Sequence, residues 1–480
     1  HRDLHSFPTR RSSDLSQQRA FSLLQLFALN PNSKVFILNG YAGTGKTTLM
    51  GGLIKWLDEK DITFSLLAST GRAAKILSDK TKSEARTVHS HIYTFNDLDD
   101  DLEKMSSVQQ ELRVDDKGQI SLLFDLKIIE SESEKIYIVD ESSMISDTPD
   151  KSASFAKFGS GELLKDLFKY DKKGKFIFIG DPCQLPPIGQ NISPALSKEY
   201  IQNHYNITVE EFELTEIVRQ SARSSIIDAS VKIRELYQNN PTVKFASFPL
   251  KNHPDIEIHS SHVSLLNSYI AQINENGFEH STLISQTNRH CSDLNKIIRS
   301  ALEKQSTQLE PGDILMVTQN NYLTTLVNGD VVEVLQTGQK EYRCGLSFVK
   351  VHVRELSSGE TYSVLLIEDI LYSMSTNLNN KQHKDLMIDY YHRMKSNGIS
   401  QKDRAFKDRM LTDPYLNGLK AVFGYALTCH KSQGGEWNEV FLYLDNKIHG
   451  IPKPGIYQWL YTALTRAKTR LHIVNDWFIK

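Results

Sequence analysis

The chain has 480 residues, of which 39% are hydrophobic and 24% charged, and its formal net charge is −2. This length predicts about three domains, and the near-neutral charge excludes a histone-like basic coat while allowing a locally basic groove. No apolar run approaches the ~20 residues of a membrane-spanning helix, so we expect no membrane partner. The four cysteines lie far apart without a C-x-x-C pair. They predict no disulfide framework and no zinc or iron–sulfur site, and they favour a reducing cytoplasm.

Residues 1–15 read HRDLHSFPTRRSSDL and connect to no pattern that follows them. The segment has neither a starting Met nor the apolar core of a signal peptide, and it resembles a translated sequencing adapter. We therefore interpret residues 1–15 as a non-native tail without chemistry. A natural basic tail is the alternative interpretation.

Residues 40–47 read GYAGTGKT, which matches the phosphate-binding pattern G-x-x-x-x-G-K-[ST] between a strand-like apolar run and a helix-like segment. Its glycines let backbone N–H groups point at phosphate oxygens, and the helix N-terminus adds a positive dipole end. Lys46 is expected to reach the β- and γ-phosphates, and Thr47 to hold Mg²⁺. A glycine turn without a ligand is the alternative. The loop residues predicted to bind ATP or GTP are Gly40, Gly43, Thr44, Gly45, Lys46, Thr47 and Thr48.

Short apolar runs alternate with helical patterns from Gln17 onward, which predicts an α/β protein with parallel sheets. The strand-like runs of the first block are 35–38, 64–68, 136–139 and 176–179. A second block contains the strand-like runs 282–285, 440–444 and 471–474 and a helix over 295–302. Four short strands with turns between them lie inside the second block, at 313–318, 331–335, 349–354 and 362–367. This pattern of short strands and turns predicts a small antiparallel barrel inserted into the second α/β domain.

Two smaller insertions are expected. Alternating residues at 112–114 and 120–124 flank the turn Asp115–Gly118, which predicts a hairpin within about 94–132. Residues 381–409 form a helical pattern with eight Lys or Arg, four Asp and two Tyr. A solvated helical face and an arm that contacts nucleic acid are the two interpretations of this segment.

The sequence IYIVDE at 136–141 is an apolar strand that ends in two carboxylates. Asp140 is expected to hold Mg²⁺ together with Thr47, and Glu141 to polarise the attacking water. The polar tip of GDPCQLPP at 180–187 follows the next strand of the same sheet, where ligands bind in such folds. There Gln184 is expected to sense the γ-phosphate and the water.

Two arginines complete the predicted ATP site. Arg219 lies in LTEIVRQ at 214–220 and Arg466 in YTALTRAK at 461–468, which belongs to the second α/β block. An arginine supplied across a cleft raises hydrolysis by ~10³–10⁵. Taken singly, each arginine fits an ordinary surface position better than a catalytic one, and only the rest of the site favours the catalytic role.

Nine motifs together resemble superfamily 1 helicases, in the RecD-like and Dda-like branch of P-loop NTPases. They are GYAGTGKT, LLASTGRAAKIL (66–77), ARTVHS (85–90), IVDESSM (138–144), GDPCQLPPIG (180–189), LTEIVRQ, QTNR (286–289), ALTCHKSQGGEW (426–437) and YTALTRAK, in the family's order. The resemblance implies two RecA-like domains that hold ATP and Mg²⁺ between them, at 16–215 and at 216–304 with 419–480. It also implies an inserted SH3-like barrel at 305–418, with the helical arm at about 380–411, and it places a strand-separating pin at the hairpin near 115–118.

The resemblance assigns further residues. Glu436 corresponds to a position near the ribose, and Gln17 to a glutamine that reads adenine, although residue 14 is Asp where the family has Thr. The DNA-facing positions that it implies are Thr70, Gly71, Thr87, His89, Thr428, His430, Lys431 and Ser432. Hydroxyls, backbone N–H groups and a lysine grip phosphates without reading bases.

The resemblance therefore implies an ATP-dependent DNA helicase that translocates on single-stranded DNA from 5′ to 3′. It implies a monomer that binds junctions of single- and double-stranded DNA, with single-strand-binding or recombination proteins as possible partners and DNA repair or recombination as its setting. Two alternatives stay open: an RNA helicase of the same superfamily, and a nucleic-acid-stimulated ATPase subunit of a nuclease complex. A metabolite kinase would leave ALTCHKSQG and YTALTRAK unexplained.

Overall fold

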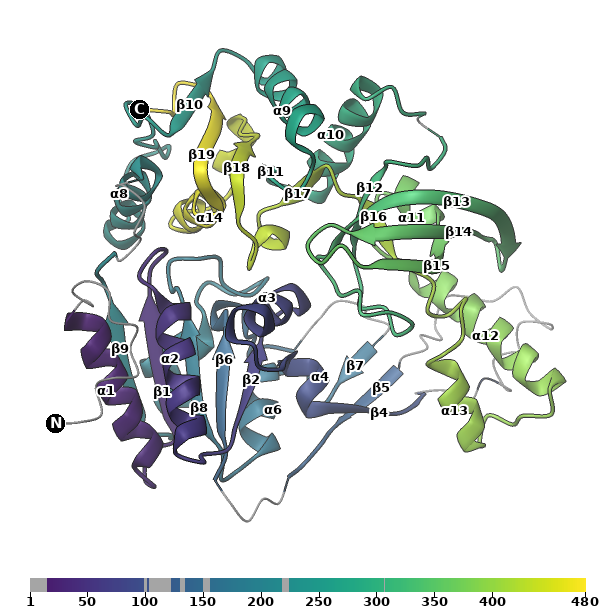
Figure 1. The fold of residues 1–480 in the computed structure, drawn as a ribbon, viewed down its shortest axis with the longest axis horizontal. Helices are drawn as coiled ribbons and strands as arrows, with labels where there is room; N and C mark the ends of the chain where they lie inside the picture. The colour runs from purple at the N-terminus through teal and green to yellow at the C-terminus, as the bar shows by residue number, and fades with distance from the viewer. Residues whose placement is uncertain are drawn as a thin grey trace.

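The computed structural model describes residues 15–98, 102, 122–129, 134–149, 156–217, 224–305 and 307–480. Two α/β bodies lie one above the other, and a green β-rich body with a helical arm lies to their right (Figure 1). Predictions that concern the tail before Leu15, residues 112–118 and Arg219 fall outside the described residues. Within the described ranges, no helix is long and apolar enough to cross a membrane.

The first α/β body is built on a six-stranded sheet in the order β3-β2-β6-β8-β1-β9, and all its pairings are parallel. Its strands are β1 (Val35–Gly40), β2 (Phe64–Ala68), β3 (Ala85–Thr87), β6 (Ile136–Asp140), β8 (Lys175–Gly180) and β9 (Val209–Leu214). Its helices are α1 (Leu15–Leu29), α2 (Lys46–Glu59), α3 (Gly71–Thr81), α4 (Val88–Ile92), α6 (Leu163–Tyr170) and α7 (Lys198–Tyr205). The prediction of a parallel α/β fold is confirmed.

Both faces of this sheet are buried, which explains the nearly continuous apolar runs of its strands. Phe36 and Leu38 of β1 pack in one core with α1 and α2. Val35 and Ile37 point the other way, into a second core with α6 and α7. Alternation along β1 therefore divides the helices between the two faces.

The second α/β body has a five-stranded parallel sheet in the order β10-β19-β18-β11-β17. Its strands are β10 (Ile256–His259), β11 (Ser281–Ser285), β17 (Ala426–Thr428), β18 (Trp437–Leu442) and β19 (Ala467–Val474). Its helices are α8 (Ser225–Asn239), α9 (His262–Asn276), α10 (Asn288–Ala301) and α14 (Gly455–Leu464). Helices α8 and α14 cover one face, and α9 and α10 the other. Teal and yellow strands lie side by side in Figure 1, because the chain leaves this sheet and returns to it.

The segment between the two halves of the second sheet forms a five-stranded antiparallel sheet in the order β15-β14-β13-β12-β16. Its strands are β12 (Ile314–Val317), β13 (Val331–Arg343), β14 (Leu346–Glu355), β15 (Thr361–Ile367) and β16 (Ala421–Phe423). The short helix α11 (Asp369–Tyr372) follows β15. The Ile367 N–H donates to the Leu419 carbonyl at 3.0 Å, so edge strand β15 meets the segment that leads into the other edge strand. The SH3-like assignment stays a prediction, as do the domain boundaries.

A small three-stranded sheet lies beside the first body. Strand β4 (Tyr93–Leu98) pairs antiparallel with β5 (Leu122–Leu126), and β5 pairs parallel with β7 (Ala156–Phe158). The expected strand at 120–124 thus corresponds to β5, which pairs with β4. The expected turn at 115–118 lies outside the described residues, so the pin assignment stays a prediction.

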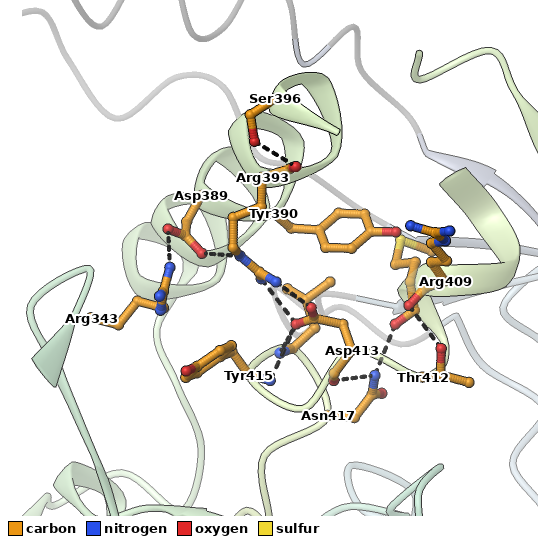
Figure 2. A network of polar contacts seen from close by, with 12 residues as sticks. Arg343, Asp389, Tyr390, Arg393, Ser396, Arg409, Thr412, Asp413, Tyr415 and Asn417 are labelled. Atoms are coloured by element: carbon orange, nitrogen blue, oxygen red, sulfur yellow. Dashed lines mark hydrogen bonds and ion pairs between the residues drawn. The ribbon is translucent and has the colours of Figure 1, made fainter. Parts of the chain in front are cut away.

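The expected helical arm consists of α12 (Asn380–Ser396) and α13 (Arg404–Met410). Its two tyrosines are buried: Tyr390 and Tyr391 pack with Met394 and Phe406, and Leu102 joins the same cluster. Figure 2 shows the polar network behind them, in which Arg393 contacts Asp389 and Asp413. The apolar side of the arm is therefore core, and only its charged side is left to solvent or a ligand.

The arm also contacts the β4–β5 insertion directly. The Leu102 N–H donates to Gln401 Oε1 at 3.0 Å, and Lys407 Nζ donates to the Asn96 carbonyl at 2.9 Å. Phe95 and Leu122 pack on the apolar cluster of the arm. The insertion of the second body is thereby joined to the insertion of the first, as the lower right of Figure 1 shows.

Candidate nucleotide and nucleic-acid site

The phosphate-binding loop lies between β1 and α2, as its sequence context predicts. Gly43 and Gly45 have φ of +81° and +80°, a conformation that side-chain-bearing residues rarely adopt. A Cβ atom at Gly45 would come within 2.3 Å of Gln17 Nε2. The Gln17 amide donates to the Thr44 carbonyl at 3.0 Å, so α1 braces the loop from outside. Gln17, expected to read adenine, lines the same cavity as the loop.

Lys46 makes contacts with the loop that a phosphate group can replace. Its Nζ donates to the Gly40 and Tyr41 carbonyls at 2.6 and 3.1 Å. The Thr44 hydroxyl also donates to the Tyr41 carbonyl, at 2.9 Å, so this side chain closes the loop on itself. The ammonium group therefore lies at the mouth of the loop, where bound phosphates need a positive charge.

Two carboxylates lie near the loop at the ends of neighbouring strands. Asp140 ends β6, and burial followed by the charge of Glu141 raises its pKa to about 6. Asp181 follows β8 and is 1% exposed, and burial raises its pKa too. The positive charge of Lys46 opposes both shifts. Carboxylate and hydroxyl oxygens are the ligands that Mg²⁺ prefers, so Asp140 and Thr47 fit that ion.

A cleft of ≈ 1380 Å³ joins the two α/β bodies and continues along α3. Thirteen of the predicted site residues line it: Gln17, Gly43, Gly45, Lys46, Thr47, Thr48, Gly71, Thr87, Asp140, Glu141, Gln184, Glu436 and Arg466. The phosphate loop and the two acids come from the first body, whereas Glu436 and Arg466 come from the second. The fold therefore brings together residues that are more than 400 positions apart.

Gln184 and Arg466 are both buried at the boundary between the two bodies. Gln184 is 4% exposed, and its Oε1 has no hydrogen-bond partner among the described residues. A buried polar atom left unsatisfied is costly, which is consistent with a ligand contact. Arg466 is held by the Thr462 carbonyl at 3.0 Å and the Gly435 carbonyl at 3.2 Å. Its guanidinium is thus oriented by its own domain.

Tyr461 lies in helix α14, which ends just before Arg466, and it was not predicted as a site residue. Its hydroxyl donates to Asp181 Oδ2 at 2.7 Å and accepts the Ala42 N–H of the phosphate loop at 3.2 Å. On the same helix, Thr462 accepts the Leu185 N–H at 2.9 Å. The sequence did contain a signal for Tyr461, because it begins the motif YTALTRAK, but only the arginine of that motif was assigned a role.

Arg72 is the second side chain of the cleft that was not predicted from the sequence. It lies over the Trp437 ring at 4.6 Å from the centroid, so a residue of α3 stacks on a residue of the second body. Its Nη1 is buried and has no partner among the described residues, and burial lowers the pKa of the guanidinium to about 10. A Cβ atom on Gly435 would come within 2.8 Å of Arg72 Cζ, which explains a glycine at that position. A cation whose Nη1 has no hydrogen-bond partner in the described part of the chain favours an anionic ligand in the cleft.

The inserted domain also touches α3. Lys75 Nζ contacts Asp330 Oδ2 at 2.5 Å and Glu355 Oε2 at 3.2 Å, and both carboxylates are buried. A Cβ atom on Gly71 would come within 2.4 Å of Val327 Cβ. The inserted domain therefore packs directly against the segment that was expected to face DNA.

Three of the residues expected to face DNA on the first body have structural contacts, as helix caps or as a packed ring. Thr70 and Thr87 cap α3 and α4, accepting the Ala73 and Ser90 N–H groups at 3.2 and 3.1 Å. His89 packs on the Phe158 ring, with centroids 5.2 Å apart. Burial lowers the pKa of His89 to about 4, so its imidazole is neutral near pH 7. This packing favours a structural role for His89 over a cationic contact with DNA.

The expected DNA-facing residues of the second body lie elsewhere. Thr428 and Lys431 line a separate cavity of ≈ 510 Å³ beside α10. Burial lowers the pKa values of His430 and Lys431. Ser432 is fully buried and donates to the Cys429 carbonyl at 2.8 Å. No single surface therefore collects all eight residues, and their DNA contacts stay predictions.

Two family models match the chain. The AAA domain matches residues 17–244, and the UvrD-like helicase C-terminal domain matches residues 423–474. The first range covers the first body and helix α8 of the second, and the second range lies mainly in the second body.

Relatives match over nearly the whole chain. The chain is 24% identical to the ATP-dependent DNA helicase dda of Enterobacteria phage T4, over 94% of this chain and 97% of that protein. It is 22% identical to the ATP-dependent RecD2 DNA helicase of Deinococcus radiodurans, over 96% of this chain but about half (49%) of that protein. A crystal structure of Bacteroides Pif1 bound to ssDNA aligns with a TM-score of 0.48 at 17% identity, over 98% of this chain and 93% of that chain. Over nearly its whole length the chain is therefore similar to the superfamily 1 helicases, in the branch that includes RecD-like proteins and Dda.

Proposed function

We propose that this chain is an ATP- and Mg²⁺-dependent DNA helicase that translocates on single-stranded DNA from 5′ to 3′ and unwinds duplex DNA. The observation that carries the proposal is the shared cleft, in which Lys46 and Asp140 of one body face Arg466 of the other. A site divided between two bodies makes hydrolysis depend on their closure. The motor activity follows because closure and opening change the distance between two DNA-gripping surfaces.

Each side chain has a chemical task in the proposed hydrolysis. Lys46 binds the phosphates, and Glu141 orients and polarises the attacking water. Thr47 and Asp140 would hold Mg²⁺, which neutralises phosphate charge when bound. Arg466 stabilises the charge that develops on the γ-phosphate. Gln184 is proposed to sense the γ-phosphate, and its Oε1, which lacks a partner among the described residues, supports this role.

DNA is proposed to bind across the two bodies through phosphate contacts rather than base contacts. Thr87 and Gly71 line the large cleft, and Lys431 and Thr428 line the second cavity. Contacts of this kind are independent of sequence and weaken steeply with salt. The 5′-to-3′ direction is proposed because Dda and RecD2 are relatives.

We further propose that the chain acts as a monomer at junctions of single- and double-stranded DNA, with single-strand-binding or recombination proteins as partners. The position of the arm supports binding at a junction, because the arm contacts the β4–β5 insertion, from which the expected pin extends. The described cysteines are free thiols, which is consistent with a reducing compartment such as the cytoplasm.

The decisive experiment compares duplexes with a 5′ or a 3′ single-stranded tail, with and without ATP. We expect unwinding of the 5′-tailed substrate alone, and abolition of ATP hydrolysis and unwinding by Lys46→Ala. Lys55→Ala, an exposed lysine on the same helix α2, is the matched control and should keep both activities. Unwinding of the 3′-tailed duplex alone, or undiminished hydrolysis by Lys46→Ala, would refute the proposal.

A parallel assay separates the alternatives. ATP hydrolysis stimulated more by RNA than by DNA oligomers of matched sequence would favour an RNA helicase, because a contact to the 2′-hydroxyl is what distinguishes the two sugars. Stimulated hydrolysis without unwinding of either tailed duplex would favour an ATPase subunit of a larger complex.

A further inference from the structure

Three side chains that can bind a metal ion meet on the second parallel sheet, and none of them lines the nucleotide cleft. Glu257 and His259 lie two residues apart on β10, so they point to the same face. His472 lies on β19, and the parallel register places it directly beside Glu257. The strand pairing therefore brings together two segments that are more than 200 residues apart.

The distances between the potential ligand atoms are close to those of a tetrahedral site. His259 Nε2 lies 3.1 Å from His472 Nδ1 and 3.7 Å from Glu257 Oε1. His472 Nδ1 lies 3.6 Å from Glu257 Oε2. In a tetrahedral zinc site with bonds of about 2.0–2.1 Å, neighbouring ligand atoms are about 3.3 Å apart. One oxygen of Glu257 and the two ring nitrogens lie within 4.8 Å of one another, so small adjustments would bring all three to one ion.

The outward-facing ring nitrogens determine where the protons are. His472 Nε2 lies 3.0 Å from Glu439 Oε2, and because a carboxylate only accepts, this nitrogen carries the hydrogen. The lone pair of His472 Nδ1 then points toward His259. A carboxylate on the outer nitrogen of a histidine is the usual support of a metal ligand, since it orients the ring and raises its basicity.

His259 has a comparable outer contact. Its Nδ1 lies 3.3 Å from the Ser264 hydroxyl, which can accept from it. With both outer nitrogens protonated, two lone pairs face each other across 3.1 Å, and a cation between them removes their repulsion. The alternative is a proton on His259 Nε2, donated to His472.

Neighbouring side chains hold the His472 ring in place, whereas the Glu257 side of the cluster is open to solvent. The His472 ring stacks on Phe441 with centroids 3.9 Å apart and planes 6° apart. Burial lowers the pKa of His472 to about 4, so the imidazole is neutral near pH 7. The side chain of Glu257 is 45% exposed and also lies 3.4 Å from Arg470 Nη1, so this carboxylate is the accessible and exchangeable ligand.

We propose that Glu257, His259 and His472 form a binding site for a divalent zinc-type ion, with water as the fourth ligand. The cysteine spacing predicted no zinc site, and these ligands are two histidines and a glutamate instead. The bound ion ties β10 to β19, the strand that begins directly after Arg466. Its role is to stabilise the second body, independently of whether the chain unwinds DNA.

The test is zinc binding by the full chain after removal of metals with a chelator. Zinc alone is titrated in competition with a chromophoric chelator, in the presence of excess Mg²⁺ so that oxygen-rich sites are occupied. We expect one tight zinc ion per chain and a rise in the melting temperature with zinc. Glu257→Gln and His259→Gln should each weaken binding by at least about 10-fold, and Glu439→Gln by ~10–100-fold.

The matched control is Glu333→Gln in the inserted domain. Like Glu257, Glu333 lies on a strand and its carboxylate pairs with an arginine. This control variant should leave zinc affinity unchanged. Glu257 is half-exposed, so its variant keeps the fold even where His259→Gln does not. Equal zinc affinity and equal melting shifts for the wild type and Glu257→Gln would overturn the proposal, and so would the absence of zinc binding by the wild type, which would indicate that the two rings share a proton.

Discussion

Replacing Tyr461 by Phe tests whether closure of the two bodies controls hydrolysis. The substitution keeps the ring and removes the hydroxyl that joins Asp181 to the phosphate loop across the cleft. Asp181 is 1% exposed, so water cannot take over the lost hydrogen bond without entering the boundary. The Cys183 N–H, at 2.9 Å, remains as a donor to the carboxylate. The variant therefore weakens one contact between the bodies without emptying the site.

The expected magnitude follows from the kind of hydrogen bond that is lost. A hydrogen bond to a charged group contributes about 1.5–3 kcal/mol, which corresponds to a factor of about 10–160 in an equilibrium constant. The closed arrangement should become less populated by that factor. If hydrolysis requires closure, kcat for DNA-stimulated ATP hydrolysis falls by up to the same factor, whereas the affinity of the first body for ATP changes little.

The assay is steady-state ATP hydrolysis with saturating single-stranded DNA, together with direct nucleotide binding. Tyr269→Phe is the matched control, because its buried hydroxyl donates at 2.7 Å to the Tyr425 carbonyl within one half of the molecule. It should lower the melting temperature but leave kcat near that of the wild type. An unchanged kcat for Tyr461→Phe, or an equal fall for both variants, would refute the reasoning.

Three further predictions concern the inserted domain and the arm. Arg393→Met removes the partner of the buried Asp413 and should lower the free energy of unfolding, measured in urea, by about 3 kcal/mol. Arg404→Met is the control: the Arg404 side chain is 93% exposed in its ion pair, so the free energy of unfolding should change by less than ~0.5 kcal/mol. Equal effects of the two variants would contradict the prediction. Burial lowers the pKa of His383 to about 3, below that of the unfolded chain, so stability is lost as pH falls below about 6.5. The loss should reach about 2 kcal/mol at pH 5 relative to pH 8, and His383→Gln should flatten this dependence; an identical pH profile would speak against it. Lys75→Met leaves two buried carboxylates without their shared cation, so amide exchange in residues 326–330 should accelerate, and unchanged exchange would show that the contact does not hold the inserted domain in place.

The nucleotide half of the site could be predicted because its chemistry is local. The loop from Gly40 to Thr47 needs its glycines, lysine and threonine in one continuous segment, and Asp140 is marked by the apolar strand before it. Strand periodicity likewise revealed both parallel sheets and the antiparallel insertion. Element ends were less accurate: β19 begins at Ala467, whereas the apolar run that predicts it begins at 471.

The surroundings of the expected DNA-facing residues could not be predicted from the sequence, because exposure is not a local property. His89 belongs to a motif, but Phe158 from a distant strand covers its ring. Gly71 lies at a helix start expected to be open, but Val327 of the inserted domain packs on it. No pattern around these residues records which distant segment will cover them.

By itself, the sequence determined that the chain has a phosphate-binding loop, two parallel α/β blocks and a β-rich insertion, because these features depend on short spacings and on burial along one strand or helix. Only the tertiary structure decided that Tyr461 contacts the phosphate loop, that Arg72 stacks on Trp437, and that His472 meets His259. These pairs depend on sheet register and on how two bodies pack, and both are set by the summed burial of many side chains. The loop is thus encoded locally, whereas its coupling to a second body is a property of the whole fold.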